Sequence, residues 1–297
     1  MFNIAKRVFL FIAVNLLILV TISIVLNLLG VQPYIQDNGI DYQSLMMFCL
    51  VWGMGASFIS LLMSRAMAKW FMGVRVLDPE NAGSYQWLVN MVTQIAKAAG
   101  MNKMPQIGIY DSPDMNAFAT GPTKNMSLVA FSTGILSSMS KEEIEGVAAH
   151  EISHITNGDM VTMTLIQGVV NAFVMFFARI IAFAVGQSVK DEMRHLVQMI
   201  TIIVLEICFG LLGMMVVGSF SRKREFRADK GSATLVGRGK MIAALKALES
   251  RQRVIPGLEE PASLATLKIS GKSGSWMNLM ATHPQLSERI KALESFS

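Results

Sequence analysis

The amino-acid sequence predicts a mostly α-helical membrane protein with four transmembrane helices and a small α+β domain outside the bilayer. Hydrophobic residues make up 52% of the 297 residues and charged residues only 16%, whereas a soluble globular protein carries about 25% charged residues. The hydrophobic residues collect in four apolar stretches, each close to the length that crosses a bilayer as a helix. These stretches cover about 8–29, 44–63, 160–185 and 196–218.

The first stretch is too long for the core of a signal peptide, and no small-residue cleavage site follows it, so we expect a retained anchor. The third and fourth stretches each contain a charged residue, Arg179 and Glu206. Charges at bilayer depth are costly and are usually paired or functional. One interpretation is an ion pair between two helices or a side chain that reaches the interface. The other is a polar lining that admits water or substrate.

The distribution of basic residues predicts the orientation of the chain in the membrane. Lys6 and Arg7 precede the first stretch, Arg65 and Lys69 follow the second, and residues 31–43 contain no Lys or Arg. The positive-inside rule therefore predicts a multi-pass membrane protein with both termini in the cytoplasm. The expected organisation is a two-helix anchor at 1–63, a cytoplasmic segment at 64–159, a membrane hairpin at 160–218 and a cytoplasmic segment at 219–297.

Cysteine usage and charge argue against several other classes of protein. Cys49 and Cys208 both lie in apolar stretches, which predicts neither a disulfide framework nor a thiolate metal cluster. The net charge is +5, and residues 219–297 are the most basic part of the chain. Because aromatic residues are not interleaved with these basic residues, we expect contact with anionic lipid and no nucleic-acid partner.

The segment between the second and third stretches has the pattern of a mixed domain. The spacing of apolar residues predicts an amphipathic helix over 84–99 that ends at Gly100. Alternating patterns separated by turn residues predict short strands over 106–110, 116–120 and 127–131.

A second helix in this segment begins at a capping box. Ser140 is followed three residues later by Glu143, which predicts a helix that starts near Lys141 and runs through His154. In the last part of the chain, helices are expected over about 222–235, 240–253 and 286–296, and a mobile loop over 255–282.

This helix contains the pattern H-E-x-x-H at His150, Glu151 and His154. Residues four apart share one face of a helix, so both imidazoles can bind one metal ion while Glu151 faces a water molecule on it. The pattern predicts one Zn²⁺ ion per chain. A structural helix that carries these residues by coincidence is the alternative.

A catalytic zinc ion takes three protein ligands, so a third ligand has to come from elsewhere in the chain. His195 lies in the loop expected on the opposite side of the membrane, whereas His283 is on the correct side and stays a candidate. The other candidate is Glu225, with Asp229 four residues later on the same helical face, suited to orienting a bound imidazole. An exposed Glu225 paired with a neighbouring arginine is the alternative. The two apolar stretches between His154 and Glu225 return the chain to the same side of the membrane, which is what binding of one ion by both residues requires.

Several motifs together resemble the family of HtpX-type bacterial inner-membrane heat-shock zinc proteases, which is related to the CAAX-prenyl endoproteases and the mitochondrial Oma-type peptidases. The resemblance covers essentially the whole chain, and the sequence shows no departure at the ligand or base positions. The motifs are Asn116 to Gly121, His150 to His154 with Gly158 and Asp159, Ser221 to Asp229, and His283-Pro284 followed by Arg289.

The resemblance implies that Glu225 is the third zinc ligand in a gluzincin-like (zincin) catalytic domain on the cytoplasmic side. It also implies that Asn116, His283 and Arg289 line the site and help to hold the substrate or the developing oxyanion. A turn asparagine, a histidine at a helix entry and a solvated arginine are the alternatives. The implied substrates are membrane proteins and unfolded polypeptides, in stress response and quality control.

The expected reaction is hydrolysis of a peptide bond, with Glu151 as the general base toward zinc-activated water. An extended substrate is expected to pair with an edge strand at 116–120 or 127–131. Two other classes remain as alternatives. One is a zinc-dependent scaffold without activity, and the presence of Glu151 argues against it because a binding site does not need a base. The other is a small transporter, and the H-E-x-x-H helix argues against it.

Overall fold

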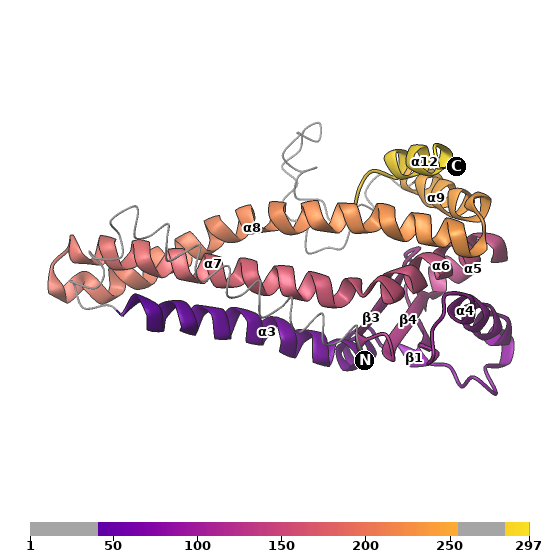
Figure 1. Ribbon diagram of the computed structural model, residues 1–297, viewed down its shortest axis with the longest axis horizontal. Helices are drawn as coiled ribbons and strands as arrows, with labels where there is room; N and C mark the ends of the chain where they lie inside the picture. Colours follow the sequence, from indigo (N-terminus) through magenta and orange to yellow (C-terminus); the bar gives the residue numbers. More distant parts are fainter. Residues whose placement is uncertain (1–40, 255–282, 297) are drawn as a thin grey trace. The chain divides into compact units, whose positions relative to one another are not determined.

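The computed structural model describes residues 41–254 and 283–296 (Figure 1). The predicted first span at 8–29 and the predicted loop at 255–282 lie outside the described residues. The chain forms two compact units. Residues up to Ile59 together with Thr164–Val217 form the helical unit, and Ser60–Met163 together with Gly218–Ser297 form the mixed unit.

Three helices of the described chain are long and apolar enough to cross a membrane: α3 (Tyr42–Phe71), α7 (Asp159–Gln187) and α8 (Asp191–Val236). They account for the second, third and fourth predicted spans. In the helical unit, Gly53 lies so close to the backbone of Ala172 that a β-carbon would be 2.7 Å from its nitrogen. Small residues of this kind allow transmembrane helices to pack backbone against backbone.

The charged residues in the third and fourth spans form an ion pair. Arg179 Nη1 on α7 lies 2.8 Å from Glu206 Oε1 on α8. The same guanidinium donates a hydrogen bond to the carbonyl of Met175, at 3.0 Å. Of the two interpretations, the ion pair between helices is confirmed, and it compensates two charges that would otherwise be costly at bilayer depth.

Two helices extend further than the sequence predicts. Helix α3 continues beyond residue 63 to Phe71, where Gly73 with φ of 64° turns the chain. The separate helix expected over 222–235 is wrong, because α8 runs without a break from Asp191 to Val236. The segment between Gly218 and Arg222 contains no proline, and its backbone continues the helical hydrogen bonding of the apolar span. The polar residues that follow Gly218 therefore mark the place where α8 leaves the apolar environment, and the helix itself continues.

A four-stranded mixed sheet lies in the mixed unit, in the order β1-β2-β4-β3. Strands β2 and β4 are parallel, whereas β1 pairs with β2 and β3 pairs with β4 in antiparallel fashion. The three predicted strands are confirmed with small shifts at their ends, and the short β1 was not predicted. The strands are β1 (Arg75–Val76), β2 (Gln106–Tyr110), β3 (Ala117–Thr123) and β4 (Met126–Ser132).

Helices pack around this sheet and enclose the core. Helix α6 packs against strands β3 and β4 and against helices α4 and α9. Fully buried side chains between them include Leu88, Phe131 and Ile152. The helices predicted over 84–99, 141–154, 240–253 and 286–296 are confirmed, and α5 is an addition. These helices are α4 (Gln86–Ala98) after a 3-10 turn, α5 (Thr133–Ser138), α6 (Lys141–Asn157), α9 (Arg238–Val254) and α12 (Leu286–Glu294).

Candidate metal centre

Helix α6 presents the H-E-x-x-H residues to the interior of the mixed unit. Its first turn carries the predicted capping box: Ser140 Oγ accepts from the Glu143 N–H, and the Glu143 carboxylate accepts from the Ser140 N–H. His150, Glu151 and His154 are all buried. A buried polar face on a capped helix requires partners from another element.

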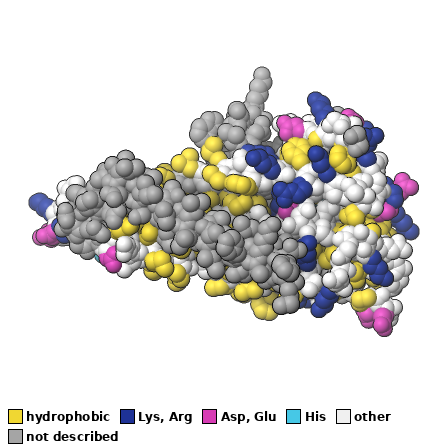
Figure 2. Space-filling model, viewed as in Figure 1, with side chains coloured by type: hydrophobic (Ala, Val, Ile, Leu, Met, Phe, Trp, Pro, Cys, Tyr) yellow, Lys and Arg dark blue, Asp and Glu magenta, His cyan; other side chains and the backbone are white. Residues whose placement is uncertain are grey.

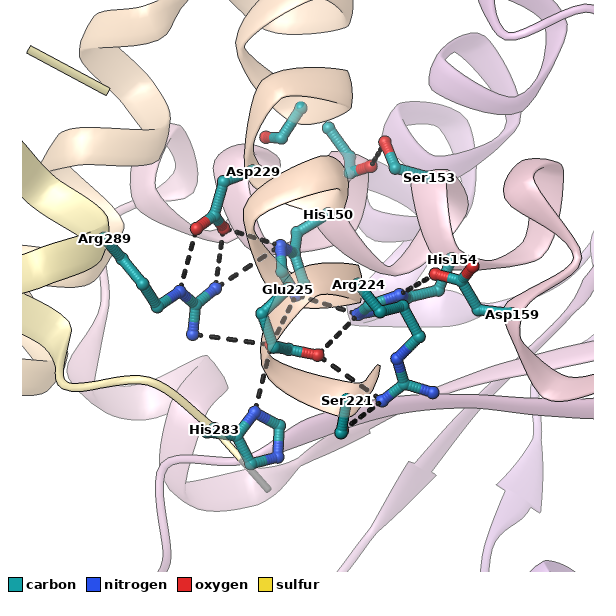
Figure 3. A network of polar contacts seen from close by, with 12 residues as sticks. His150, Ser153, His154, Asp159, Ser221, Arg224, Glu225, Asp229, His283 and Arg289 are labelled. Atoms are coloured by element: carbon teal, nitrogen blue, oxygen red, sulfur yellow. Dashed lines mark hydrogen bonds and ion pairs between the residues drawn. The ribbon is translucent and has the colours of Figure 1, made fainter. Parts of the chain in front are cut away.

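Helix α8 supplies those partners (Figure 3). Glu225 has only 1% of its surface exposed, and its two carboxylate oxygens face the two imidazoles. Glu225 Oε2 lies 3.5 Å from His150 Nε2, and Glu225 Oε1 lies 3.3 Å from His154 Nε2. The two Nε2 atoms are 3.1 Å apart. The three residues therefore each direct one possible ligand atom toward a common point, and these three atoms lie within 4.8 Å of one another.

These separations fit a divalent metal ion. In a tetrahedral site with metal–ligand distances of about 2.0–2.1 Å, ligand atoms lie about 3.3 Å apart. Two imidazole nitrogens and one carboxylate form a common donor set for transition metals, and three protein ligands leave a fourth position open. Glu225 Oε2 is buried, and within the described part of the chain no contact to it has full hydrogen-bond geometry, although His283 Nδ1 lies 3.0 Å away. This oxygen can therefore accept a cation.

The electrostatics of the site favour positive charge at the same point. Burial lowers the pKa of both histidines, but carboxylate partners outweigh it: Asp229 and Glu225 raise the pKa of His150, and Asp159 and Glu225 raise the pKa of His154 to about 9. Burial raises the pKa of Glu225, yet its histidine contacts hold that pKa well below the usual range. A bound cation would supply the charge that this arrangement stabilises.

A buried chain of contacts orients His150. Asp229, one helical turn after Glu225 on α8, places Oδ1 2.9 Å from His150 Nδ1. Arg289 from α12 donates to both oxygens of Asp229, at 2.8 Å from Nε and 2.6 Å from Nη2. Burial acts against both charges, but their pairing lowers the pKa of Asp229 and raises that of Arg289. Arg289 thus lies at the site, as the resemblance implied, and there it contacts the partner of an imidazole; the alternative of a solvated arginine is wrong, because Arg289 is buried.

His154 has its own carboxylate partner, which the sequence reasoning missed. Asp159 Oδ2 lies 2.7 Å from His154 Nδ1. The chain reverses between them because Gly158 adopts a left-handed conformation, with φ of 72° and ψ of 35°. Helix α6 ends and α7 begins there, which returns Asp159 to the imidazole. The signal in the sequence was a glycine followed by an acid, just after the motif.

The remaining predicted residues lie at different distances from this cluster. His283 is half exposed, and its Nδ1 lies 3.0 Å from Glu225 Oε2. Asn116 has an exposed side chain, and its backbone carbonyl accepts from the backbone N–H of Ser132. His195 is exposed in the first turns of α8, in the helical unit. Figure 3 labels His283 within the network.

The apolar helices, the mixed sheet and the buried cluster of potential metal ligands together define a membrane metallopeptidase. The chain belongs to peptidase family M48, whose family model matches residues 83–297. It is 52% identical to a protease HtpX homolog of Bacillus licheniformis, over 98% of this chain and 99% of that protein. It is 50% identical to protease HtpX of Aeromonas salmonicida, over 97% of this chain and 99% of that protein.

A solved structure supports the fold. The crystal structure of Ste24p from S. mikatae matches with a TM-score of 0.57 at 17% sequence identity. The match covers 93% of this chain and 64% of the other, so the chain spans less than two thirds of the length of Ste24p. At this identity the likeness concerns the fold alone. The resemblance to the HtpX family that the motifs indicated is confirmed by the family match and the curated relatives.

Proposed function

We propose that this protein is a zinc-dependent membrane endopeptidase that cleaves damaged or misfolded membrane proteins on the cytoplasmic side of the inner membrane. The observation that carries the proposal is the buried convergence of His150, His154 and Glu225, with Glu151 beside His150 on the same helix. A site that only binds metal has no need of a buried carboxylate at Glu151, because burying a charge without a role is costly.

His150, His154 and Glu225 would hold the zinc ion. When bound, zinc supplies Lewis acidity, which polarises the scissile carbonyl and acidifies a water molecule. The contacts of Asp229 with His150 and of Asp159 with His154 fix each ring so that its Nε2 faces the common point. Carboxylate partners of this kind also raise the basicity of a ligating imidazole.

Glu151 is proposed as the general base. It accepts the proton of the attacking water and delivers that proton to the nitrogen of the leaving amine. His283 is half exposed beside Glu225, so it can donate a hydrogen bond to the oxygen that develops negative charge on the substrate. Asn116, whose exposed side chain lies just before β3, is proposed to contact the substrate backbone.

Strand β3 is the proposed binding edge for an extended substrate. Of the two segments considered, 127–131 is wrong as an edge, because β4 is paired on one side with β2 and on the other with β3. Strand β3 has only β4 as a partner within the described chain, and it packs against α6. A peptide added to β3 would therefore run beside the helix that carries the catalytic residues.

Proline substitutions test this edge. In an antiparallel pair, neighbouring residues direct their N–H groups alternately toward the partner strand and away from it. One of the two variants Phe118→Pro and Ala119→Pro therefore loses an N–H group that points away from β4, toward an added peptide. That variant should cleave peptides more slowly while the protein keeps its thermal stability. Full cleavage by both variants would refute pairing at β3.

Three glutamate variants test the enzyme assignment. Glu151→Gln should retain stoichiometric zinc and lose cleavage of both a casein-like and a membrane-protein substrate. Glu225→Ala should lose zinc as well as cleavage. Glu145→Gln is the matched control, because Glu145 lies on α6 but pairs with Lys240 at 2.7 Å, outside the metal cluster. It should leave zinc content and cleavage unchanged.

Metal analysis separates the outcomes. Cleavage by Glu151→Gln would exclude this residue as the base. Zinc binding with no cleavage by the unmodified protein, on either substrate, would indicate a scaffold that retains the metal. A zinc content that survives Glu225→Ala would assign the third ligand to another residue, and His283 is then the first one to replace.

A further inference from the structure

The C-terminal end of helix α3 has one buried and one exposed face within the mixed unit. Ala68 is buried, and it packs with Val74 and Tyr110 beside the sheet. Trp70 and Phe71 are 76% and 79% exposed, although they are among the largest apolar side chains. Exposed aromatic pairs of this size mark an interaction surface.

Basic residues flank this aromatic pair in the sequence. Lys69 precedes Trp70 on the helix, and Arg75 is exposed in the first strand. Helix α8 shows the same combination in the mixed unit, where Phe220 is 49% exposed and Lys223 is exposed three residues later. Hydrophobic side chains lie beside Lys and Arg side chains on the surface drawn in Figure 2. Two helices therefore carry aromatic and basic residues together.

The position of these residues along their helices matches the edge of a bilayer. Trp70 lies about 16 residues, or about 25 Å, beyond the middle of the apolar stretch at 44–63. Phe220 lies about 13 residues, or about 20 Å, beyond the middle of the stretch at 196–218. The hydrocarbon core ends about 15 Å from the bilayer centre and the headgroups end at about 20–22 Å. Helix tilts of about 20–40° would bring Trp70 to about 19–23 Å.

We propose that the mixed unit rests on the surface of an anionic membrane through an interfacial collar formed by Trp70, Phe71 and Phe220 with the basic residues Lys69, Arg75 and Lys223. Tryptophan and other aromatic side chains prefer the headgroup level, where an apolar ring and a polar environment meet. Adjacent Lys and Arg are attracted by anionic headgroups. Both helices continue from the collar into membrane spans, so the bilayer is the partner that is already adjacent.

The collar has a consequence for catalysis. Because Ala68 packs beside the sheet, anchoring the neighbouring Trp70 and Phe71 fixes the height of the sheet, and with it β3, above the membrane. Membrane-anchored substrates present their cleavable segment at a limited height, whereas soluble peptides reach the site from any direction. The collar therefore discriminates in favour of substrates attached to the bilayer. This consequence rests on the proposed function, but the position of Trp70 in the membrane does not.

Depth-dependent fluorescence quenching tests the position directly. The protein has four tryptophans, and single-tryptophan forms of the full chain that keep Trp52, Trp70 or Trp87 are reconstituted in phosphatidylglycerol-containing vesicles. Lipids brominated near the headgroup should quench Trp70 best, and lipids brominated near the chain end should quench Trp52 best. Trp87 packs against the core under Lys141 and should be quenched by neither. Quenching of Trp70 like that of Trp87, or as deep as that of Trp52, would refute the collar.

A double variant, Trp70→Ala with Phe71→Ala, tests the consequence. Its cleavage of a membrane-anchored substrate should fall several-fold, whereas its cleavage of a soluble casein peptide should stay unchanged. Met126→Ala is the matched control, because it removes an exposed apolar side chain of the mixed unit that lies on β4, and it should change neither rate. An equal loss on both substrates would refute the role in discrimination, while the quenching result still decides the position. Absence of cleavage by the unmodified protein would instead contradict the proposed function.

Discussion

Gly231 on α8 lies against Ser153 on α6 with no room for a side chain. A β-carbon on Gly231 would lie 2.5 Å from Ser153 Oγ and 2.8 Å from Ser153 Cβ. Ser153 directly precedes His154, and Gly231 follows Glu225 by less than two helical turns. The adjacent Ser232 donates a 2.8 Å hydrogen bond to the carbonyl of Gly146 on α6. The close approach of the two helices is therefore what brings Glu225 within reach of both imidazoles.

Gly231→Ala should weaken zinc binding and lower the thermal stability of the protein. Overpacking a tight contact costs about 1–3 kcal/mol, and the cost here is relieved by moving α8 away from α6. Zinc affinity and the midpoint of thermal unfolding in detergent measure the two effects. Gly239→Ala is the control, because Gly239 has open space around it.

A compensating substitution separates positioning from general damage. Ser153→Gly removes both atoms that a β-carbon at Gly231 would meet, at a cost of about 1 kcal/mol for a glycine inside a helix. The double variant should therefore bind zinc more tightly than Gly231→Ala alone. If it binds zinc no better, the contact does not set the position of Glu225.

Asp159→Asn should weaken zinc binding about 10–100-fold, the usual effect of losing a carboxylate that orients a metal-bound histidine. The substitution keeps the shape of the side chain and removes its charge beside His154. Competition with a chelator of known affinity measures the change. Asp114→Asn is a suitable control, since Asp114 is exposed and its carboxylate contacts Ser112. Unchanged zinc affinity in Asp159→Asn would show that this contact is dispensable.

Arg289→Gln should destabilise the protein by about 3–5 kcal/mol, because it leaves Asp229 buried without its positive partner. Adding Asp229→Asn should recover part of this loss, since two neutral side chains can still share a hydrogen bond. Thermal unfolding of the two single variants and the double variant measures the coupling between the residues. Strictly additive losses would contradict the pairing.

The Arg179–Glu206 ion pair gives a similar test in the membrane. Glu206→Gln leaves Arg179 without its partner, which is destabilising because an unpaired arginine costs up to about 2.5–3.5 kcal/mol in a transmembrane helix, with the largest cost at the helix centre. The double variant Arg179→Gln with Glu206→Gln should be more stable than Glu206→Gln alone. Thermal unfolding in the same detergent compares them. Equal stability of the single and double variants would mean that the pair is solvated and contributes little.

Local sequence patterns were enough to predict much of this protein. The capping box at Ser140 and Glu143 fixed where α6 begins, and the spacing of His150 and His154 placed both imidazoles on one face of that helix. Hydropathy predicted the spans corresponding to α3, α7 and α8. Each of these features depends on residues within a few helical turns of one another, so the sequence alone carries the necessary information.

Contacts between distant residues were decided only by the tertiary structure. Spacing alone left Glu225 and His283 as alternative ligands, because no local pattern reports the distance between α6 and α8. At that distance Gly231 packs directly against Ser153, and the sequence singled out neither residue. Arg289 was expected at the site only from the family resemblance, and its contact with Asp229 became visible only where α12 packs it there. The sequence determined which helix holds the metal motif, whereas side-chain packing between helices completed the site around it.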